Sequence, residues 1–307
     1  MAETIITNLK TYDVIIIGGS YAGLSAAMAL GRSMKKVLII DSGQPCNRQT
    51  PHSHNFITQD GEKPAVIAAK AKEQVLRYET VTFVSTVASA GRKTEKGFTV
   101  VTKDGEEFTA EKLIFASGIK DLMPGIEGFS QCWGISVIHC PYCHGYEFRG
   151  KRTAVMANGE KAFHLSSLVS NLTDDLTILT LGKSDFDDRQ ISALNKRGIK
   201  IIENEITEIE HENGHVKNIH FRGAEKMKFD AVYAVVKFEQ HSDIPASLGC
   251  ELTETGHIKI DAFQQTTVEG VYACGDNSSA LRTVANAVYS GNLAGSMVNR
   301  KLTEERF

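Results

Sequence analysis

The sequence lacks a hydrophobic run long enough to cross a membrane, because none approaches the roughly 20 apolar residues that a helical span requires. It also lacks any block of like charge. The 307 residues carry a net charge of −3, so nothing favours binding to nucleic acid or to an anionic membrane. The polar N-terminal segment, residues 1–13, has no basic region followed by an apolar stretch, and so shows no secretory signal. These absences favour a cytoplasmic protein.

Length and composition indicate an ordinary globular protein of more than one domain. Hydrophobic residues make up 42% of the chain and charged residues 23%, which is typical of folded proteins. A chain of 307 residues is longer than one hydrophobic core usually supports. We therefore expect two domains.

Cysteine is scarce, with six residues in the chain. In the cytoplasm such residues do not form a disulfide framework, and a close pair is more typical of a catalytic or metal-binding site. We interpret the four scattered cysteines as small buried hydrophobic residues rather than reactive thiols. These four are Cys46, Cys132, Cys250 and Cys274.

The close pair, Cys140 and Cys143, lies in the stretch 139–147, which reads His-Cys-Pro-Tyr-Cys-His-Gly-Tyr-Glu. Two cysteines at this spacing suggest a dithiol that opens and closes as a disulfide, and an adjacent imidazole helps a reactive thiolate to form. Pro141 suits the first turn of a helix. The same Cys-x-x-Cys-His pattern also occurs at haem attachment sites and as half of a zinc site. The motif alone leaves all three interpretations open.

A dinucleotide-binding unit is predicted near the N-terminus. Residues 13–17 are a continuous apolar run, as expected of a buried parallel strand. The glycine-rich turn Gly18-Gly19-Ser20-Tyr21-Ala22-Gly23, a helix over 24–31 and a second strand over 36–40 follow. Asp41 then stands 18 residues beyond Gly23. In this context the helix N-terminus would meet a pyrophosphate and Asp41 a ribose hydroxyl, although Ser20 replaces the usual middle glycine.

The rest of the chain alternates strands and helices, and a fainter copy of the first unit appears in its middle. Here a strand over 153–156, a turn at 157–162, a helix over 163–172 and a strand over 176–180 are expected. A helix, further strands and a hairpin are predicted over 63–77, 81–87, 98–101, 107–109, 112–118, 201–202, 216–221 and 231–236. Towards the C-terminus, strands are expected over 256–260 and 266–276 and a helix over 283–298. Gly291 and Gly295 share one face of this helix, where we expect a close packing contact.

Three motifs in this order resemble the low-molecular-weight thioredoxin reductase family over nearly the whole chain. They are the glycine turn at 18–23, the Cys-x-x-Cys at 140–143, and Thr266 to Asp276, which ends in Gly-Val-Tyr-Ala-Cys-Gly-Asp. Within the family, Cys-x-x-Cys-His-Gly-Tyr-Glu looks most like the branch that includes the gliotoxin and holomycin dithiol oxidases.

The resemblance implies an α/β fold of two Rossmann-like three-layer domains. The FAD domain would be split into residues 1–118 and 245–307, around an inserted NAD(P)-type domain, 119–244, that carries the redox pair. It also implies a homodimer in which electrons pass from NADPH through FAD to the disulfide. A thioredoxin-like protein or a small dithiol would be the partner. By the same analogy Cys143 faces the flavin, Cys140 attacks the substrate sulfur, and His144, where the family has aspartate, moves protons.

The FAD contacts expected from the motifs and from the resemblance lie in several short stretches of the first domain. They are Gly18, Gly19, Ser20, Tyr21, Ala22, Gly23, Asp41, Gln44, Asn47, Asn55, Val87, Ala116, Ser117, Gly118, Gly275, Asp276, Val284 and Ala285.

The expected NADPH site departs from the family pattern. The stretch 181–187 lacks the family's arginines; Lys183 is the one residue there that could meet a phosphate, and Asp187 would repel it. Glu160 stands where a pyrophosphate should meet a helix start. NADPH use is therefore an open expectation, beside an oxygen-coupled dithiol oxidase and a ferredoxin-dependent reductase. A metal- or haem-binding protein is the remote alternative.

Overall fold

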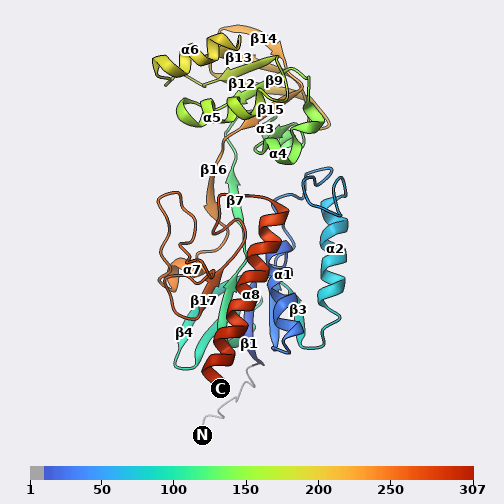
Figure 1. Cartoon of the computed structure of the whole chain (residues 1–307), viewed down its shortest axis with the longest axis vertical. Helices are drawn as coiled ribbons and strands as arrows, with labels where there is room; N and C mark the ends of the chain where they lie inside the picture. The colour runs from blue at the N-terminus through green and yellow to red at the C-terminus, as the bar shows by residue number, and fades with distance from the viewer. Residues whose placement is uncertain (1–9) are drawn as a thin grey trace. The chain divides into compact units, whose positions relative to one another are not determined.

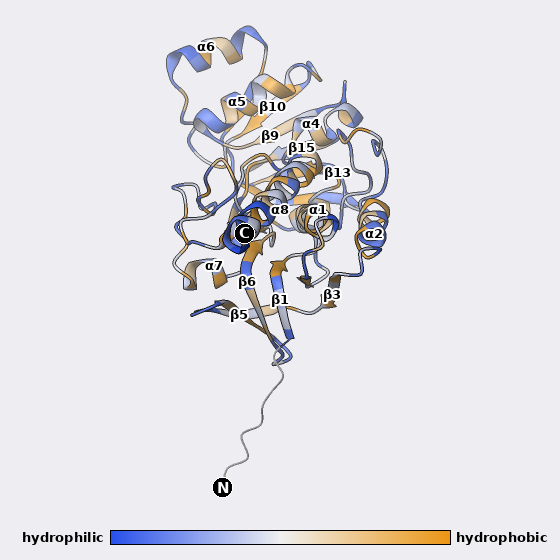
Figure 2. Cartoon of the chain, turned by 60° about the horizontal axis from the view of Figure 1, so that its bottom comes forward, coloured by the Kyte–Doolittle hydropathy of each residue, from blue (hydrophilic) through white to orange (hydrophobic). Residues whose placement is uncertain are grey.

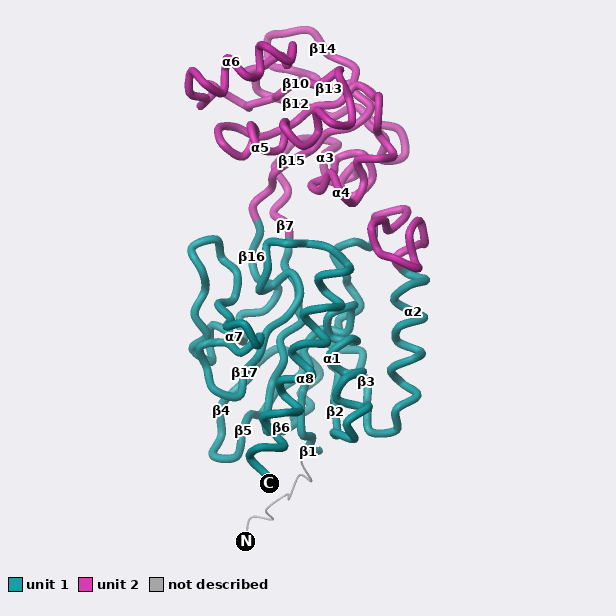
Figure 3. Tube along the Cα trace, viewed as in Figure 1, with its two compact units in different colours: residues 1–48, 65–120, 238–307 teal, residues 49–64, 121–237 magenta. Residues whose placement is uncertain are grey.

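The computed structural model describes residues 10–307, which form two compact units (Figure 3). Of the described residues, unit 1 comprises 10–48, Ala65–Lys120 and Phe238–Phe307, and unit 2 comprises Gln49–Pro64 and Asp121–Lys237. Most of the polar segment expected over 1–13 lies outside the described residues. None of the helices in the described part of the chain is both long enough and apolar enough to span a membrane.

Unit 1 contains a seven-stranded sheet, in which β3, β2, β1 and β6 lie side by side in that order and run parallel. β17 pairs in parallel with the end of β6, while β5 and β4 continue the sheet as an antiparallel meander. The strands and helices (Figure 1) are β1 (Lys10–Ile17), α1 (Tyr21–Arg32), β2 (Val37–Asp41), α2 (Pro64–Val75), β3 (Val81–Ser85), β4 (Ala88–Thr94), β5 (Gly97–Thr102), β6 (Glu107–Phe115), α7 (Ile244–Ser247), β17 (Val271–Ala273) and α8 (Val284–Arg306).

The central strands of this sheet are buried on both faces. Val14, Ile15 and Ile16 are fully buried, as are Leu38 and Ile39 of the neighbouring strand. Figure 2 shows hydrophobic residues, in orange, on β1 and β6. The predicted buried parallel strand is therefore confirmed. A continuous apolar run suits this strand because both of its faces are buried.

Helix α8 packs unusually close to α1 because it presents glycine to it. A Cβ atom on Gly291 would lie 2.1 Å from the carbonyl oxygen of Ala22, and one on Gly295 would lie 2.5 Å from that of Ala26. The close contact predicted for these two glycines is confirmed.

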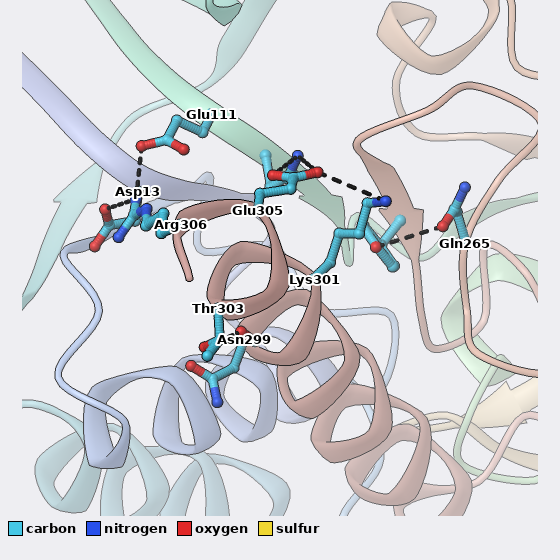
Figure 4. Close-up of polar contacts among 10 residues, drawn as sticks. Asp13, Glu111, Gln265, Asn299, Lys301, Thr303, Glu305 and Arg306 are labelled. Atoms are coloured by element: carbon cyan, nitrogen blue, oxygen red, sulfur yellow. Dashed lines mark hydrogen bonds and ion pairs between the residues drawn. The ribbon is translucent and has the colours of Figure 1, made fainter.

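Charged side chains fix the C-terminal end of α8 (Figure 4). Arg306 pairs with Asp13 of β1, and its guanidinium donates to Glu111 of β6 at 2.6 Å. The buried amine of Lys112 lies 2.7 Å from the carboxylate of Glu305. These pairs hold the last helix of the chain on strands β1 and β6 of the sheet.

Unit 2 contains a parallel five-stranded sheet in the order β11, β10, β9, β15, β8, and a separate antiparallel sheet of β12, β13 and β14. Its elements are α3 (Phe129–Cys132), β8 (Val137–Ile138), α4 (Pro141–His144), a 3₁₀ turn (Tyr146–Phe148), β9 (Thr153–Met156), α5 (Gly159–Val169), β10 (Leu176–Leu179), α6 (Asp188–Lys196), β11 (Lys200–Ile202), β12 (Ile206–Glu212), β13 (His215–Phe221), β14 (Ala224–Lys228) and β15 (Ala231–Ala234). The predicted second strand–turn–helix–strand unit is thus present. The chain leaves and re-enters unit 1 at β7 (Ile119–Leu122) and β16 (Lys237–Gln240), which pair as a two-stranded sheet.

Two predicted strands near the C-terminus are wrong or too long. Residues 256–260 form no strand, because Ile258 and Ile260 pair only through isolated bridges with Leu252 and Thr266. The strand expected over 266–276 is confined to Val271–Ala273, where β6 offers a parallel partner. The C-terminal helix, in contrast, extends beyond its predicted end at 298 as far as Arg306.

Candidate active site

The redox pair sits at the start of a short helix in unit 2. Cys140 is the residue before α4, and its sulfur accepts the backbone N–H of Cys143 at 3.2 Å. Pro141 occupies the first helical turn, where its missing N–H costs nothing. Cys140 and Cys143 are joined as a disulfide with their Cα atoms 5.3 Å apart. The N–H that points at Cys140 favours a thiolate on that sulfur when the bond is reduced.

His144 ends this helix, directly after Cys143. Burial lowers the pKa of the imidazole, the charge of His54 lowers it further, and the carboxylate of Glu147 acts in the opposite direction. The neutral ring is therefore favoured near neutral pH, and a neutral ring has a nitrogen free to accept a proton.

A pocket of about 250 Å³ opens beside α4 within unit 2. Half of its lining comes from the loop 53–62, which is closed by pairing between Ser53 and Glu62 and by a 2.7 Å bond from the Asn55 N–H to Asp60. The lining residues are His54, Asn55, Asp60, Tyr142, Tyr146 and Glu147. Sequence reasoning missed His54, Asp60 and the role of Glu147.

Most of the residues predicted to bind FAD lie where parallel strands of unit 1 end. The Gly18 N–H donates to Ile40 at 2.8 Å, that of Ala116 donates to Ile17 at 2.8 Å, and that of Cys274 donates to Phe115 at 3.0 Å. The carboxyl ends of β1, β2, β6 and β17 therefore meet at one edge, which is where open α/β sheets bind ligands. The structure thus brings together Gly18 to Gly23, Asp41, Ala116 to Gly118, and Gly275 with Asp276.

The first glycine turn has no room for side chains at its two ends. Gly18 has φ +106°, and a Cβ there would lie 2.2 Å from the Ala116 oxygen. A Cβ on Gly23 would lie 1.8 Å from the Gly18 oxygen. Asp41 braces the turn, because its carboxylate accepts the N–H of Gly19 at 2.8 Å and that of Gly43 at 3.1 Å.

The N-terminus of α1 fits a pyrophosphate. Its cap residue, Ser20, makes no side-chain hydrogen bond to the helix, and no acidic residue lies in the first turn. N–H groups at an uncapped helix start form an anion site. Nearby, the buried Oδ1 of Asn277 has no hydrogen-bond partner among the described residues, while its amide nitrogen donates to Phe115 at 2.8 Å. An unused acceptor beside Asp276 suits a polar cofactor.

The remaining predicted FAD contacts are more scattered. Asn47 donates to the Tyr21 hydroxyl at 3.4 Å, and Gln44 is exposed on the same loop. Val87, 45% exposed, follows β3, and Val284 and Ala285 open α8 behind its cap Thr283. Asn55 lies in unit 2, where it lines the pocket beside α4.

The second glycine turn, before α5, is arranged differently. The side chain of Asn158 caps the helix by accepting the N–H of Gly159 at 2.8 Å, and it also accepts that of Asp185 at 2.9 Å. Glu160 lies in the first turn and accepts a 2.6 Å bond from Gln190. A helix start that is capped by its own chain and carries a carboxylate does not fit a pyrophosphate as the first turn does.

Of the other four cysteines, three are buried and one is exposed. Burial raises the pKa of Cys132 to about 11 and that of Cys274 to about 12, and it also raises the pKa of Cys250. These three are buried, as predicted, whereas Cys46 is exposed and the prediction was wrong for it. Cys46 belongs to the polar loop after β2, and its sulfur donates to Asp276 at 3.8 Å.

A redox disulfide on a short helix, together with a dinucleotide turn on a separate parallel sheet, defines the class of flavin-dependent disulfide oxidoreductases. The family model for pyridine nucleotide-disulphide oxidoreductases matches residues 12–291, and the chain belongs to that family. Thioredoxin reductase tcpT of Claviceps purpurea is 32% identical over 301 residues, covering 94% of each chain. Thioredoxin reductase sirT of Leptosphaeria maculans is also 32% identical, covering 94% of this chain and 93% of its own. Among solved structures, an oxidoreductase from Agrobacterium tumefaciens is 36% identical with a TM-score of 0.90, covering 96% of this chain and 99% of its own.

The protein is therefore an FAD-dependent disulfide oxidoreductase that resembles thioredoxin reductase, and its family implies the use of FAD and NADPH. The two-domain α/β fold expected from the sequence is confirmed by the same relatives.

Proposed function

We propose that the protein exchanges electrons between FAD, held by unit 1, and the Cys140–Cys143 disulfide, and passes them on to a thioredoxin-like protein or a small disulfide. The observation that carries this proposal is the position of the disulfide, with the Cys143 N–H aimed at the Cys140 sulfur and His144 one residue further on. Bound FAD would supply the two-electron chemistry. The expected FAD residues, Asn55 included, remain part of this proposal, as does the division into FAD and NAD(P)-type domains.

The exchange at the two sulfurs transfers two electrons and two protons in three steps. In the reduced protein Cys140 gives its proton to His144 and attacks one sulfur of the substrate disulfide. The S–S bond of the substrate breaks, and its leaving thiolate takes the proton back from His144. Cys143 then attacks the Cys140 sulfur, which re-forms the protein disulfide and releases the second substrate thiol with the Cys143 proton. The substrate gains two electrons and two protons.

The visible spectrum of the purified protein tests the cofactor. We expect flavin bands at one FAD per chain, and protein that is colourless even after incubation with FAD would overturn the proposal. Substitution of Gly18 by valine should remove the bands, because a side chain there meets the Ala116 backbone. Substitution of Gly125 by valine is the matched control and should leave them, because Gly125 lies in unit 2, has no positive φ, and a Cβ there would meet nothing within 4 Å.

Replacement of His144 tests the proton transfer. We expect His144→Ala to lower turnover by roughly 10²-fold, which is the lower range for general acid–base catalysis. In the wild type, turnover should fall as the pH drops through the His144 pKa, because protonation removes the acceptor; burial lowers that pKa, so the fall lies on the acid side of the ordinary value. The acid limb should vanish in His144→Ala. A profile of unaltered shape would contradict the role given to this residue.

A second candidate direction is the oxidation of a small dithiol, in which two electrons and two protons pass from the dithiol to oxygen and give peroxide. The observation that favours it is the second glycine turn, which is capped by Asn158 and carries Glu160. Anaerobic titration of the bound flavin with NADPH, NADH and a dithiol separates the directions. Bleaching by NADPH supports the reductase, and bleaching by the dithiol alone, with peroxide formed in air, supports the oxidase. Bleaching only by reduced ferredoxin would identify a third donor.

We also propose that the protein works as a homodimer in the cytoplasm, as the resemblance implies. Light scattering coupled to gel filtration should give twice the chain mass of 33.6 kDa, and a mass of one chain would contradict it.

A further inference from the structure

The loop 53–62 brings a second histidine to the redox helix. Its ends are held by a 2.8 Å bond from Ser53 to Glu62 and a 2.8 Å bond from Gly61 to Ser53. Between these ends, Asp60 accepts the Asn55 N–H at 2.7 Å. The loop therefore has a defined shape, and it places His54 in the pocket beside α4.

His54 is bracketed by two carboxylates. Its Nδ1 lies 3.7 Å from Asp60 and its Nε2 lies 3.6 Å from Glu147, while 21% of its side chain is exposed. Both ring nitrogens thus face negative oxygen atoms. The ring therefore lies between two acidic side chains, each within ion-pair distance of one of its nitrogens.

His54 also meets His144 directly. The two rings are perpendicular, with an interplanar angle of 87° and centroids 6.4 Å apart. Glu147 stands three residues after His144 on the same stretch of chain, so the carboxylate that pairs with His54 is also near His144. No other imidazole pairs with the ring of His144 among the described residues; His52 contacts His54 but not His144.

We propose that His54 is a positioning residue for the proton transfer at Cys140: its charge keeps His144 in the neutral, proton-accepting form, and Glu147 limits that effect. This inference rests on the proposed function, in which His144 takes and returns the Cys140 proton. The lowered pKa of His144, to which burial contributes most and His54 next, agrees with it. Within the described part of the chain His54 makes no hydrogen bond to either sulfur, so its role is indirect.

The groups that face His144 come from three parts of unit 2. They are His54 of the loop, Glu147 of the turn after α4, and, once the disulfide is reduced, the thiols of Cys140 and Cys143 of the redox helix; Asp60 reaches His54 rather than His144. Tyr233 of β15 lies behind the turn, and burial together with the Glu147 charge raises its pKa well above the ordinary value, so it stays neutral. Of these groups, only His54 adds positive charge near His144.

Two substitutions with opposite expected effects test the proposal. His54→Asn removes the positive charge, so the His144 pKa should rise and the acid limb of the turnover profile should move to higher pH. Glu147→Gln removes the negative charge, so the His144 pKa and the acid limb should move to lower pH. His52→Asn changes a histidine of the same segment that hydrogen-bonds to the Gly61 carbonyl rather than to His144, and it should shift neither.

The His144 pKa is measured by NMR titration of the oxidised, FAD-loaded protein with labelled histidine, which needs no substrate. Shifts in opposite directions for His54→Asn and Glu147→Gln support the proposal. It is overturned if the His144 pKa in both variants equals that in His52→Asn. Should His54→Asn unfold, an unshifted His144 pKa in Glu147→Gln overturns it. Should the NMR pKa shift while the turnover profile stays fixed, the charge coupling stands and the proton role given to His144 in the proposed function fails.

Discussion

Substitution of either redox cysteine by serine should abolish turnover, by roughly 10³-fold or more, while leaving FAD bound. Neither sulfur can be replaced, because a serine hydroxyl forms no disulfide. FAD should be retained because both cysteines belong to unit 2, whereas nearly all of the proposed FAD residues belong to unit 1. Turnover is measured with a dithiol–disulfide pair in both directions, and FAD content is measured from the visible spectrum.

The two variants should differ in what they trap. In Cys143→Ser the Cys140 thiolate, favoured by the N–H of residue 143, still attacks the substrate but nothing resolves the product. A mixed disulfide should accumulate, visible as an intact mass increased by the substrate. Cys140→Ser should show no such adduct while its flavin can still be reduced. An adduct in Cys140→Ser instead would reverse the assignment of the two sulfurs.

Cys46→Ser is the matched control for these variants. Cys46 is an exposed cysteine outside the redox pair, and a serine hydroxyl can replace its hydrogen bond to Asp276. Turnover and FAD content should both stay at the wild-type level. A loss of turnover equal to that of Cys140→Ser would show that the assay reports a general thiol effect.

Local pattern predicted the parts of the fold whose partners are close in sequence. One short stretch of sequence contains the apolar run at 13–17, the glycine turn and Asp41. In the structure the Gly19 N–H donates to Asp41 and joins the turn to the second strand. Cys140 and Cys143 were predicted for the same reason. Glycine spacing even indicated that Gly291 and Gly295 needed a close neighbour, although it could not say that the neighbour was α1.

Contacts between distant segments could not be predicted from one sequence. His54 and His144 are 90 positions apart, and nothing in either local pattern shows that the loop 53–62 belongs with unit 2. The failed strand at 256–260 has the same cause, because its alternation of residues fits a strand but no neighbouring strand is there to pair with it. The sequence offered one signal of function for His54: it follows His52 by two residues in a segment without apolar periodicity.

Substitution of Gly291 by alanine should destabilise unit 1 and release FAD, although the sequence position lies far from the glycine turn. Alanine favours a helix interior by about 1 kcal/mol over glycine, so helix propensity alone predicts a gain in stability. The added methyl, however, would lie 2.1 Å from the Ala22 oxygen and 2.8 Å from its carbonyl carbon, both of which belong to the rigid backbone of α1. Overpacking of this kind costs about 1–3 kcal/mol and occasionally more.

The sign of the Gly291→Ala effect depends on whether α1 and α8 can move apart, and contacts of both helices indicate that they cannot do so freely. The first turn of α1 is tied to the glycine turn, where a Cβ on Gly23 would lie 1.8 Å from the Gly18 oxygen, and the far end of α8 is fixed by Arg306 and Glu305. We therefore expect a net loss of about 2 kcal/mol in the free energy of unfolding of unit 1 and weaker FAD binding. Thermal unfolding and FAD titration measure these, with Asn292→Ala, an exposed neighbour on the same helix, as the control. A variant as stable as Asn292→Ala that binds FAD normally would show that α8 can shift away from α1 without disturbing the nucleotide turn.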